Sequence, residues 1–494
     1  MKVMLASPPA YYEDTNKFFV QTGSRWSHTT DWPEEKYKEV ENTIAHYPFY
    51  IGYSSSLLKR EVGVDVLPFD ACGLKLNKDE FVREIIDQNP DLLLVEIPTI
   101  SFDLTMPLLK RVKDKINCKL AISGFHVTAL WERAMEKYPF IDFSLLGEYE
   151  ITLKELVASM ENGGNFSKIN GLVFRKEGEL EKTKKRELIK NLDDLPFPDR
   201  DSLPVENCYG QKKVSPDNLS FPIWTSRGCP FGCSFCVERQ VLYGCSIYRK
   251  RSPEKIVDEM EECFDKYGAD QIDFDDMSMT VDKKHVEDIC KEIIKRGRDM
   301  PWASMGDMNV DYETMKLMKE AGCGKICFGL ETVDPDSLKN AGKEWVNVEK
   351  AEKFVKNCRD LEIISHATYT IGLPGDTEEK INATINFSKK LNTDTAQWSI
   401  ATPYPGTPFF ERAKKKGWLV TYDWSQYDGN RRSVLSYPQL SRKKIEKLYW
   451  KAQREWKNHV RKRKIKNPHK TIPELLKRIK KNGIKNSLKI ALGG

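Results

Sequence analysis

The chain has 494 residues, which is too many for one hydrophobic core and predicts two or three domains. With 40% apolar and 31% charged residues, and no apolar run of about eighteen residues, the composition argues against a membrane span and favours a globular protein. The first residues show no secretory apolar region, so we expect a cytoplasmic protein. In that reducing compartment the 12 cysteines do not predict a disulfide scaffold.

The positive charge is concentrated near the C-terminus. The chain has a net charge of +6, but residues 441–494 carry 19 Lys and Arg against 3 Asp and Glu. This segment therefore contributes +16 and leaves −10 for the other 440 residues. The basic character belongs to the tail and not to the body of the protein.

Residues 1–160 alternate short apolar runs with helical patterns, which predicts a doubly wound parallel sheet of the Rossmann-like type, an α/β fold. Ligands of such sheets bind outside the carboxyl ends of the strands. The candidate ligand contacts at these ends are Ser7, Pro8, Pro9, Pro98, Thr99, Gly124, His126, Gly147 and Glu148. Glycine and proline also end ordinary strands, and the alternative role of the histidine is to cap a helix.

The remaining chain divides into three parts. Residues 161–214 predict a hairpin with a Glu-Gly turn, followed by a Pro- and Asp-rich linker. Residues 215–412 contain about six βα units, too few for a closed eightfold barrel, and predict an open, partial (β/α)6 barrel. Residues 413–494 form a C-terminal extension that is expected to be helical and basic from about residue 440.

Three cysteines lie close together on a glycine-containing loop after a predicted strand: Cys229, Cys233 and Cys236. Structural zinc normally takes four ligands, and Cys245 is the one nearby residue that could supply the fourth. A redox CxxC pair would leave Cys229 unexplained. An iron–sulfur cluster bound by three thiolates would keep one iron open, and the spacing favours this alternative without excluding the other two.

Four motifs in order resemble those of the radical SAM superfamily. They are CPFGCSFC (229–236), IDFDDMSMT (272–280), FGLETVDP (328–335) and IGLPGDTEE (371–379). The resemblance implies that the three thiolates hold a 4Fe–4S cluster whose open iron binds the amine and carboxylate of S-adenosylmethionine (SAM). An electron from the cluster would then yield a 5′-deoxyadenosyl radical that abstracts hydrogen from an unactivated carbon.

The same resemblance implies six SAM contacts: Phe235, Asp275, Asp276, Glu331, Gly372 and Gly375. The phenylalanine would lie near adenine, the carboxylates near the ammonium or the ribose hydroxyls, and the glycines would let backbone approach adenine. Each residue type also has an ordinary role, as a core aromatic, a helix N-cap or a turn residue. We expect His285, His366 and the CxxxC pair Cys323 and Cys327 to be structural.

The N-terminal half resembles the cobalamin-binding domain of one large radical SAM subfamily. ASPPA (6–10), ISGFHVTAL (122–130) and DFSLLGE (142–148) carry this resemblance. GSRWSH (23–28) is similar to a stretch in relatives of the anaerobic Mg-protoporphyrin ester cyclase and of lipid-tailoring enzymes. The DxHxxG histidine of methionine-synthase-type domains is missing from the segment 70–73, so cobalamin is expected to bind without a histidine below cobalt.

The resemblance implies an enzyme that methylates carbon in a small-molecule or lipid-like substrate, with radical cyclisation or C–C bond formation as the alternative. A non-catalytic Fe–S module would not need the SAM motifs. A tRNA methylthiotransferase would need additional N-terminal cysteines, whereas Cys72 and Cys118 alone precede residue 200. The expected electron donor is a ferredoxin or flavodoxin.

The C-terminal segment TIPELLKRIKKNG (471–483) predicts a basic amphipathic helix. Such a helix can bind an anionic membrane surface, which would make the protein peripheral to the membrane. Docking of its apolar face on the barrel is the competing interpretation, and nucleic acid is a weaker third candidate. Tyr449, Trp450 and Trp456 are expected to add interfacial contacts upstream.

Overall fold

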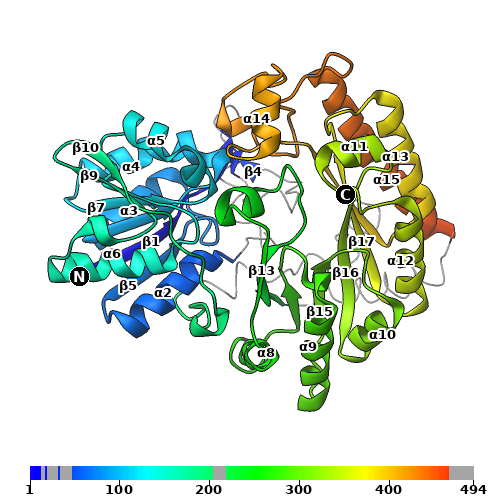
Figure 1. The fold of residues 1–494 in the computed structure, drawn as a ribbon, viewed down its shortest axis with the longest axis horizontal. Coiled ribbons are helices and arrows are strands. Elements are labelled where there is room, and N and C mark those ends of the chain that lie inside the picture. The colour runs from blue at the N-terminus through cyan, green and yellow to red at the C-terminus, as the bar shows by residue number, and fades with distance from the viewer. Residues whose placement is uncertain (13–16, 19–31, 34–46, 204–218, 467–494) are drawn as a thin grey trace.

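The computed structural model describes residues 1–12, 17–18, 32–33, 47–203 and 219–466. Two α/β bodies lie next to each other, one formed by the N-terminal strands and one by the strands after residue 219 (Figure 1). In this described part of the chain, no helix combines the length and apolarity needed to cross a bilayer. The motif at 23–28 and the predicted amphipathic helix at 471–483 lie outside the described residues.

A seven-stranded sheet with helices on both faces forms the first body (Figure 1). Its strands are β1 (Lys2–Ser7), β5 (Asp65–Asp70), β6 (Leu92–Glu96), β7 (Lys119–Ser123), β8 (Phe143–Leu145), β9 (Leu172–Lys176) and β10 (Glu179–Lys182). Its helices are α2 (Phe49–Glu61), α3 (Lys78–Gln88), α4 (Phe102–Lys113), α5 (Phe125–Lys137) and α6 (Glu150–Asn162). A small sheet joins β2 (Tyr11–Tyr12), β3 (Lys17–Phe18) and β4 (Trp32–Pro33).

The sheet order is β10-β9-β8-β7-β6-β1-β5, and the strands from β5 to β8 are parallel. These five strands thus have the flavodoxin-like order 2-1-3-4-5, with a topological switch point between β1 and β6. Strand β6, LLLVE, is almost wholly apolar because helices cover both of its faces. The predicted doubly wound sheet is confirmed.

The predicted hairpin is the pair β9–β10, and it extends the first sheet. Glu177 and Gly178 connect its strands with φ values of 51° and 90°, as a type I′ turn requires. Strand β9 also pairs antiparallel with β8. The hairpin is therefore part of the N-terminal body.

Six parallel strands form the second body and confirm the predicted half-barrel. In sheet order, which is also chain order, they are β11 (Ser220–Ile223), β14 (Gln271–Phe274), β15 (Trp302–Gly306), β16 (Cys323–Glu331), β17 (Ile364–Ile371) and β18 (Thr395–Ile400). The helices between them are α8 (Pro253–Tyr267), α9 (Lys283–Arg296), α10 (Tyr312–Glu320), α11 (Pro335–Ala341), α12 (Val348–Asp360) and α13 (Glu378–Leu391). An antiparallel pair, β12 (Ser226–Cys229) and β13 (Ile247–Lys250), is inserted between β11 and α8, with the short helix η4 (Glu238–Tyr243) between its strands.

The C-terminal extension continues through α14 (Pro408–Lys415) and the single-turn helix η6 (Trp424–Gln426) to the long helix α15 (Arg442–Lys466). Helix α15 packs on α13 and β18. It buries Tyr449 and Trp456, whereas Trp450 is 53% exposed. The expected interfacial role is therefore wrong for Tyr449 and Trp456, because both side chains pack against the barrel.

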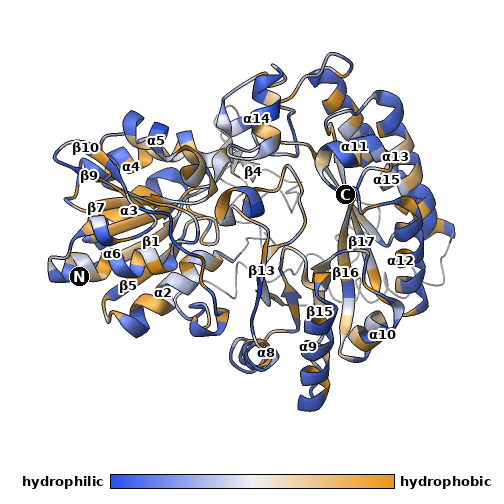
Figure 2. Cartoon of the chain, in the orientation of Figure 1, coloured by the Kyte–Doolittle hydropathy of each residue, from blue (hydrophilic) through white to orange (hydrophobic). Residues whose placement is uncertain are grey.

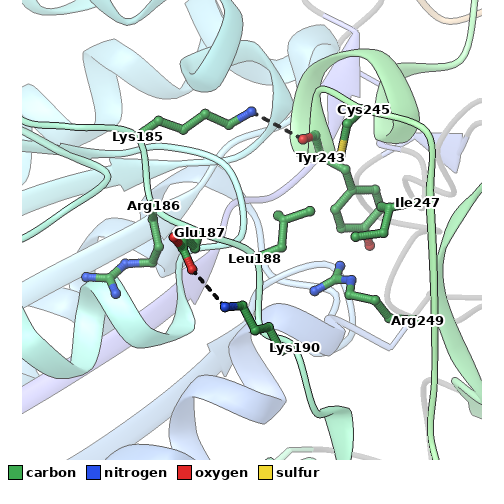
Figure 3. Close-up of a pocket in the computed structure, with 9 residues that line it drawn as sticks. All are labelled: Lys185, Arg186, Glu187, Leu188, Lys190, Tyr243, Cys245, Ile247 and Arg249. Carbon is green, nitrogen blue, oxygen red and sulfur yellow. Dashed lines mark hydrogen bonds and ion pairs between the residues drawn. The ribbon is translucent and has the colours of Figure 1, made fainter.

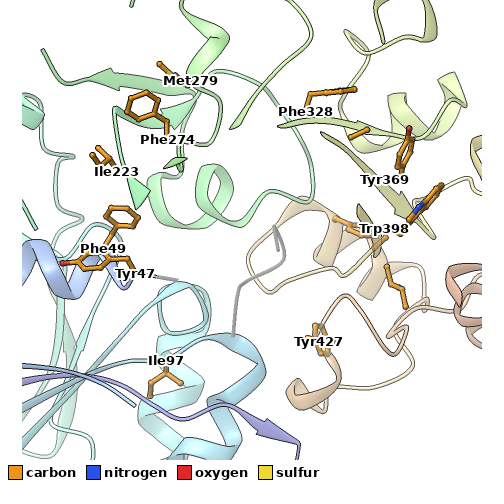
Figure 4. Close-up of a cluster of buried hydrophobic side chains, with 14 of the residues drawn as sticks. Tyr47, Phe49, Ile97, Ile223, Phe274, Met279, Phe328, Tyr369, Trp398 and Tyr427 are labelled. Atoms are coloured by element: carbon orange, nitrogen blue, oxygen red, sulfur yellow. The ribbon is translucent and has the colours of Figure 1, made fainter. Parts of the chain in front are cut away.

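The apolar core is continuous between the two bodies. One cluster of buried side chains includes Tyr47 and Ile97 from the first body, Phe328 from the second and Tyr427 from the C-terminal extension (Figure 4). Apolar residues gather in the strands, and hydrophilic residues cover the outer helices (Figure 2). The two bodies are thus packed against each other through buried side chains.

Candidate functional site

The loop with the three clustered cysteines begins where β12 ends. Gly228 has φ 94°, and a Cβ at this position would lie 2.3 Å from the Ile247 carbonyl oxygen of β13, so only glycine fits. Cys229 is buried at the strand end, whereas Cys233 and Cys236 are partly exposed on the loop. The Cys236 N–H donates to the Cys233 carbonyl at 3.3 Å, which folds the loop back on itself.

Four hydrogen bonds hold this loop in place. The Ser234 N–H donates to the carbonyl of Ala341 at the end of α11 (2.9 Å), and the Phe409 N–H of α14 donates to the Ser234 carbonyl (3.1 Å). Gln240 Nε2 donates to the Cys233 carbonyl (2.9 Å), and Ser246 Oγ to the Pro230 carbonyl (2.8 Å). Anchors from distant parts of the chain thus fix the backbone that carries the thiols.

Three thiols on this loop are the donor set available for a cluster. Within the described ranges, no three His, Cys, Asp or Glu side chains are grouped closely enough to hold one metal ion. A cubane cluster needs no such convergence because each thiolate binds a different iron. Burial raises the pKa of Cys233 to about 11, and the nearby Lys343 ammonium opposes that rise. A positive charge is therefore already in place to stabilise thiolates and a cluster.

Lys343 forms a buried ion pair with Glu331 at the end of β16. Its Nζ lies 2.8 Å from Glu331 Oε1 and donates to the Gly329 carbonyl at 3.0 Å. Thr370 Oγ1 of β17 donates to the other oxygen of Glu331 at 2.6 Å. Burial lowers the pKa of Lys343, but Glu331 and the Cys233 thiol raise it above its usual value. This pair links the cysteine loop to the ends of two barrel strands.

Glu331 is held in an uncommon backbone conformation. Its φ is 63°, and the pairing register of β16 with β17 shifts between Gly329 and Glu331. Such left-handed residues other than glycine concentrate at functional sites, where the surrounding structure maintains the strain. The bulge directs the Glu331 carboxylate to Lys343 and Thr370. Sequence reasoning selected Glu331 but missed both partners, since neither belongs to the quoted motifs.

Asp276 is buried beside the connection between β11 and β12, and its SAM contact stays a prediction. Its buried carboxylate accepts hydrogen bonds from the backbone N–H groups of Thr225 (3.0 Å) and Ser226 (2.6 Å) and from both hydroxyls. Burial raises its pKa to about 6. These bonds hold the connection between β11 and β12. Asp282, and neither Asp275 nor Asp276, is the N-cap of α9. Half-buried Asp275 follows β14, and its SAM contact stays a prediction.

The glycine turn after β17 is rigid. Gly372 and Gly375 have φ values of 86° and 96°, which favour glycine at both positions. The buried Asp376 carboxylate closes the turn by accepting from the N–H groups of Gly372 (2.9 Å) and Leu373 (3.0 Å). Phe235 is half-buried against the core. The geometry is compatible with the proposed adenine contacts of these residues, and those contacts stay predictions.

The N-terminal body brings most of its predicted contacts to one edge. Ser7 ends β1 and is followed by Pro8 and Pro9, and Pro98 and Thr99 follow β6. These residues therefore flank the switch point where such sheets bind ligands. Gly124 has φ 110°, and a Cβ there would lie 2.9 Å from the Ile97 carbonyl oxygen. A Cβ on Gly147 would lie 3.3 Å from the Leu242 carbonyl oxygen in η4. This edge therefore meets the segment that follows the cysteine loop.

His126 lies in an aromatic contact between the first body and the C-terminal extension. Its ring stacks on Phe102 at 4.1 Å and meets Trp424 of η6 edge-on at 5.0 Å. Burial, with a contribution from Arg133, lowers its pKa to about 3. Its environment is that of a neutral packing residue. Burial also lowers the pKa of His285 to about 4 and of His366 to about 3.

Glu148 is part of a buried charge cluster between the two bodies. Arg227 Nη1 of β12 lies 2.7 Å from Glu148 and 2.7 Å from Glu150, and Arg249 of β13 lies 2.8 Å from Glu148. Burial alone would raise the pKa of Glu148, but the two guanidinium groups hold it below its usual value. The Glu148 carboxylate thus already pairs with two cations. A direct ligand contact for Glu148 stays a prediction. Sequence reasoning missed both arginines.

Three other cysteines, outside this loop, differ in burial. Cys323 and Cys327 are buried in β16, with their pKa values raised by burial. Cys245, the fourth candidate ligand for zinc, is exposed next to β13.

Comparison with known proteins agrees with this arrangement. Residues 224–388 match the radical SAM superfamily. The chain is 32% identical over 422 residues to an uncharacterized methyltransferase of Pyrococcus horikoshii, covering 85% of this chain and 89% of the relative. It is 27% identical over 394 residues to the anaerobic magnesium-protoporphyrin IX monomethyl ester cyclase of Cereibacter sphaeroides, covering 77% and 62%.

Among solved structures, the fold is similar to that of the methyltransferase TsrM from Kitasatospora setae, whose structure holds cobalamin and a [4Fe–4S] cluster. The TM-score is 0.66 at 17% identity, with 85% of this chain and 79% of that chain covered.

Proposed function

The chain belongs to the radical SAM superfamily, and from this premise we propose that it is a cobalamin-dependent enzyme that methylates an unactivated carbon of a small molecule. The observation that carries the proposal is the junction of two sites. The cysteine loop follows β12, in the strand pair inserted after the first barrel strand, and Glu331 ends barrel strand β16. The switch-point edge of a flavodoxin-like sheet meets the segment after that loop. When bound, the cluster with SAM supplies a 5′-deoxyadenosyl radical and cobalamin supplies the methyl group.

The chain's own residues position these groups and exclude water. Cys229, Cys233 and Cys236 would each hold one iron. Glu331, fixed by Lys343 and Thr370, would present its carboxylate toward the ribose or amine of SAM. The backbone of the turn at 372–375 would lie against adenine.

On the other side of the junction, the strand ends near Ser7, Pro98, Gly124 and Gly147 would cradle cobalamin. The segment 70–73 offers no histidine for cobalt, and buried His126 packs between two aromatic rings. We expect cobalt without a protein imidazole. Paramagnetic resonance of the Co(II) form tests this, because nitrogen splitting from an imidazole would contradict it.

A substrate-free assay tests the proposal. Anaerobically reconstituted protein, reduced with dithionite and supplied with SAM, should release 5′-deoxyadenosine, and alanine at any one of the three cysteines should abolish the release. With cobalamin added, the parent protein should also release S-adenosylhomocysteine. Deoxyadenosine alone would favour a cyclase, the activity named for the Cereibacter relative. The absence of both products in the parent protein would refute the proposal.

The finer partners are part of the same proposal. The electron comes from a ferredoxin or flavodoxin, and the basic segment 471–483 attaches the protein to an anionic membrane that holds a lipid-like substrate. Flotation with anionic vesicles at low salt tests the second point. Deletion of 467–494 leaves the packed helix α15 in place and should abolish flotation if that segment is the anchor.

A further inference from the structure

A basic pocket lies beside the cysteine loop, outside the site described above. It has a volume of about 610 Å3 (Figure 3). Two segments line it, one after β10 and one from η4 to β13, with the residues Lys185, Arg186, Glu187, Leu188, Lys190, Tyr243, Cys245, Ile247 and Arg249. Four of these nine residues are cationic and one is a carboxylate, so the lining has an excess of positive charge.

The solvent-exposed positive charge of the lining belongs to Lys185 and Lys190. Arg186 and Arg249 are paired with Glu155 and Glu148 and are largely buried. Lys190, in contrast, is 87% exposed, and its contact with the equally exposed Glu187 at 3.3 Å contributes little. Lys185 Nζ donates to a backbone carbonyl, that of Tyr243, at 3.3 Å, which leaves its charge uncompensated there (Figure 3).

The pocket wall is one strand away from a candidate cluster ligand. Ile247 lies directly opposite Cys229 in the β12–β13 pair, where Cα atoms are about 4.5–5.5 Å apart. Ser246, between the lining residues Cys245 and Ile247, donates to the carbonyl of Pro230, the residue after Cys229. A partner seated on the pocket would therefore approach the cluster across a single strand.

We propose that this basic pocket is the docking surface for an acidic one-electron carrier protein that reduces the cluster. The proposal rests on the proposed function, which needs an electron delivered from outside. One electron leaves the carrier, which is oxidised by one equivalent, and enters the cluster, which is reduced by one equivalent. Complementary charge selects an acidic partner and speeds its encounter, and a transient electron-transfer contact needs only a small interface.

Charge reversal tests the surface. The double variant Lys185→Glu with Lys190→Glu should slow reduction of the reconstituted holoenzyme by reduced flavodoxin about tenfold at low salt, and the difference should shrink as salt is added. The matched control reverses two exposed lysines, Lys316 on α10 and Lys353 on α12, away from β13 (Figure 1). We expect the control to keep the parent rate.

Dithionite in excess separates the two proposals. The same final extent of cluster reduction in all three proteins shows that each cluster is intact. A parent protein that dithionite cannot reduce refutes the proposed function itself. An unchanged flavodoxin rate in the Lys185/Lys190 variant, or an equal slowing in the control, refutes the docking surface. Loss of binding of inorganic phosphate with an unchanged flavodoxin rate would assign the pocket to a small anion and overturn the proposal.

Discussion

Replacing Arg227 with methionine should destabilise the protein strongly, because this guanidinium pairs with two buried carboxylates, of which, among the residues that the structure describes, only Glu148 has a second cationic partner, Arg249. Arg227, Glu148 and Glu150 have side chains that are 3%, 2% and 0% exposed, and both N–O distances are 2.7 Å. Removing one partner of a buried pair costs about 3–5 kcal/mol. Since native proteins are stable by about 5–15 kcal/mol, the variant should lose a large share of its stability.

The loss should depend on pH. Burial raises the pKa of Glu150, and Arg227 partly opposes this, so the variant raises it further. A carboxyl whose folded-state pKa is raised binds more protons folded than unfolded, and its stability contribution falls as pH rises through the folded pKa. The deficit of Arg227→Met relative to the parent should therefore increase as the pH rises.

Thermal unfolding of the anaerobic protein measures the effect. With an unfolding entropy of about 2.1 cal/mol/K per residue over 494 residues, a loss of 3–5 kcal/mol corresponds to an unfolding midpoint lower by roughly 3–5 °C. The matched control is Lys154→Met, which removes an exposed pair with Glu61 of nearly the same length, 2.8 Å, and should cost about 0–1 kcal/mol. Adding Glu150→Gln to Arg227→Met should restore part of the loss. A deficit no larger than that of Lys154→Met would refute the reasoning.

Three further predictions follow from buried groups. Lys343→Met should lower the cluster's midpoint potential by on the order of 60 mV, about 1.4 kcal/mol for one electron. The reason is that a cation near the thiols favours the more negative reduced state. A redox titration followed by paramagnetic resonance checks this. Burial raises the pKa of Glu96 to about 7. The free energy of unfolding should therefore fall by roughly 1.4 kcal/mol per pH unit as the pH rises from 5 to 7. Glu96→Gln should flatten that decline, as measured by denaturant titrations. Cys323→Ser and Cys327→Ser should leave the iron content unchanged, whereas a loss of iron would contradict their assignment to the core.

The fold was largely predictable because its signals are local. The strands of the half-barrel are short segments that are apolar or alternate buried with less buried residues, and the helices between them repeat an apolar face. The Glu-Gly turn of the β9–β10 hairpin is also a local signal. The dense spacing of the three cysteines predicts a metal-binding loop, and that part of the site stays a prediction. What the local pattern did not show is that this hairpin pairs with β8 and so belongs to the first sheet.

The partners of the site residues were not predictable because they are distant in sequence. Glu331 is paired with Lys343 on the segment after α11 and with Thr370 on the next strand, contacts that only the bulge at Gly329 and the strand register create. The sequence offers Asp275 and Asp276 as alternative N-caps, whereas Asp282 caps α9 and Asp276 accepts hydrogen bonds from the β11–β12 connection. His126 follows a strand end as a ligand contact would, yet Trp424, about 300 residues later, packs against it.

The contact between the two bodies depends on charge as well as on apolar packing, and this affects how independent they are. Strand β12 carries Cys229 at its end and Arg227 two residues earlier, and Arg249 lies on the paired strand β13. Their carboxylate partners, Glu148 and Glu150, come from the first body. Without that body, these carboxylates could not compensate either guanidinium in the strand pair that carries the cysteine loop. The geometry of the loop is therefore set jointly by both bodies, so that the sheet edge proposed for cobalamin and the thiols proposed for the cluster are held in one fixed relation.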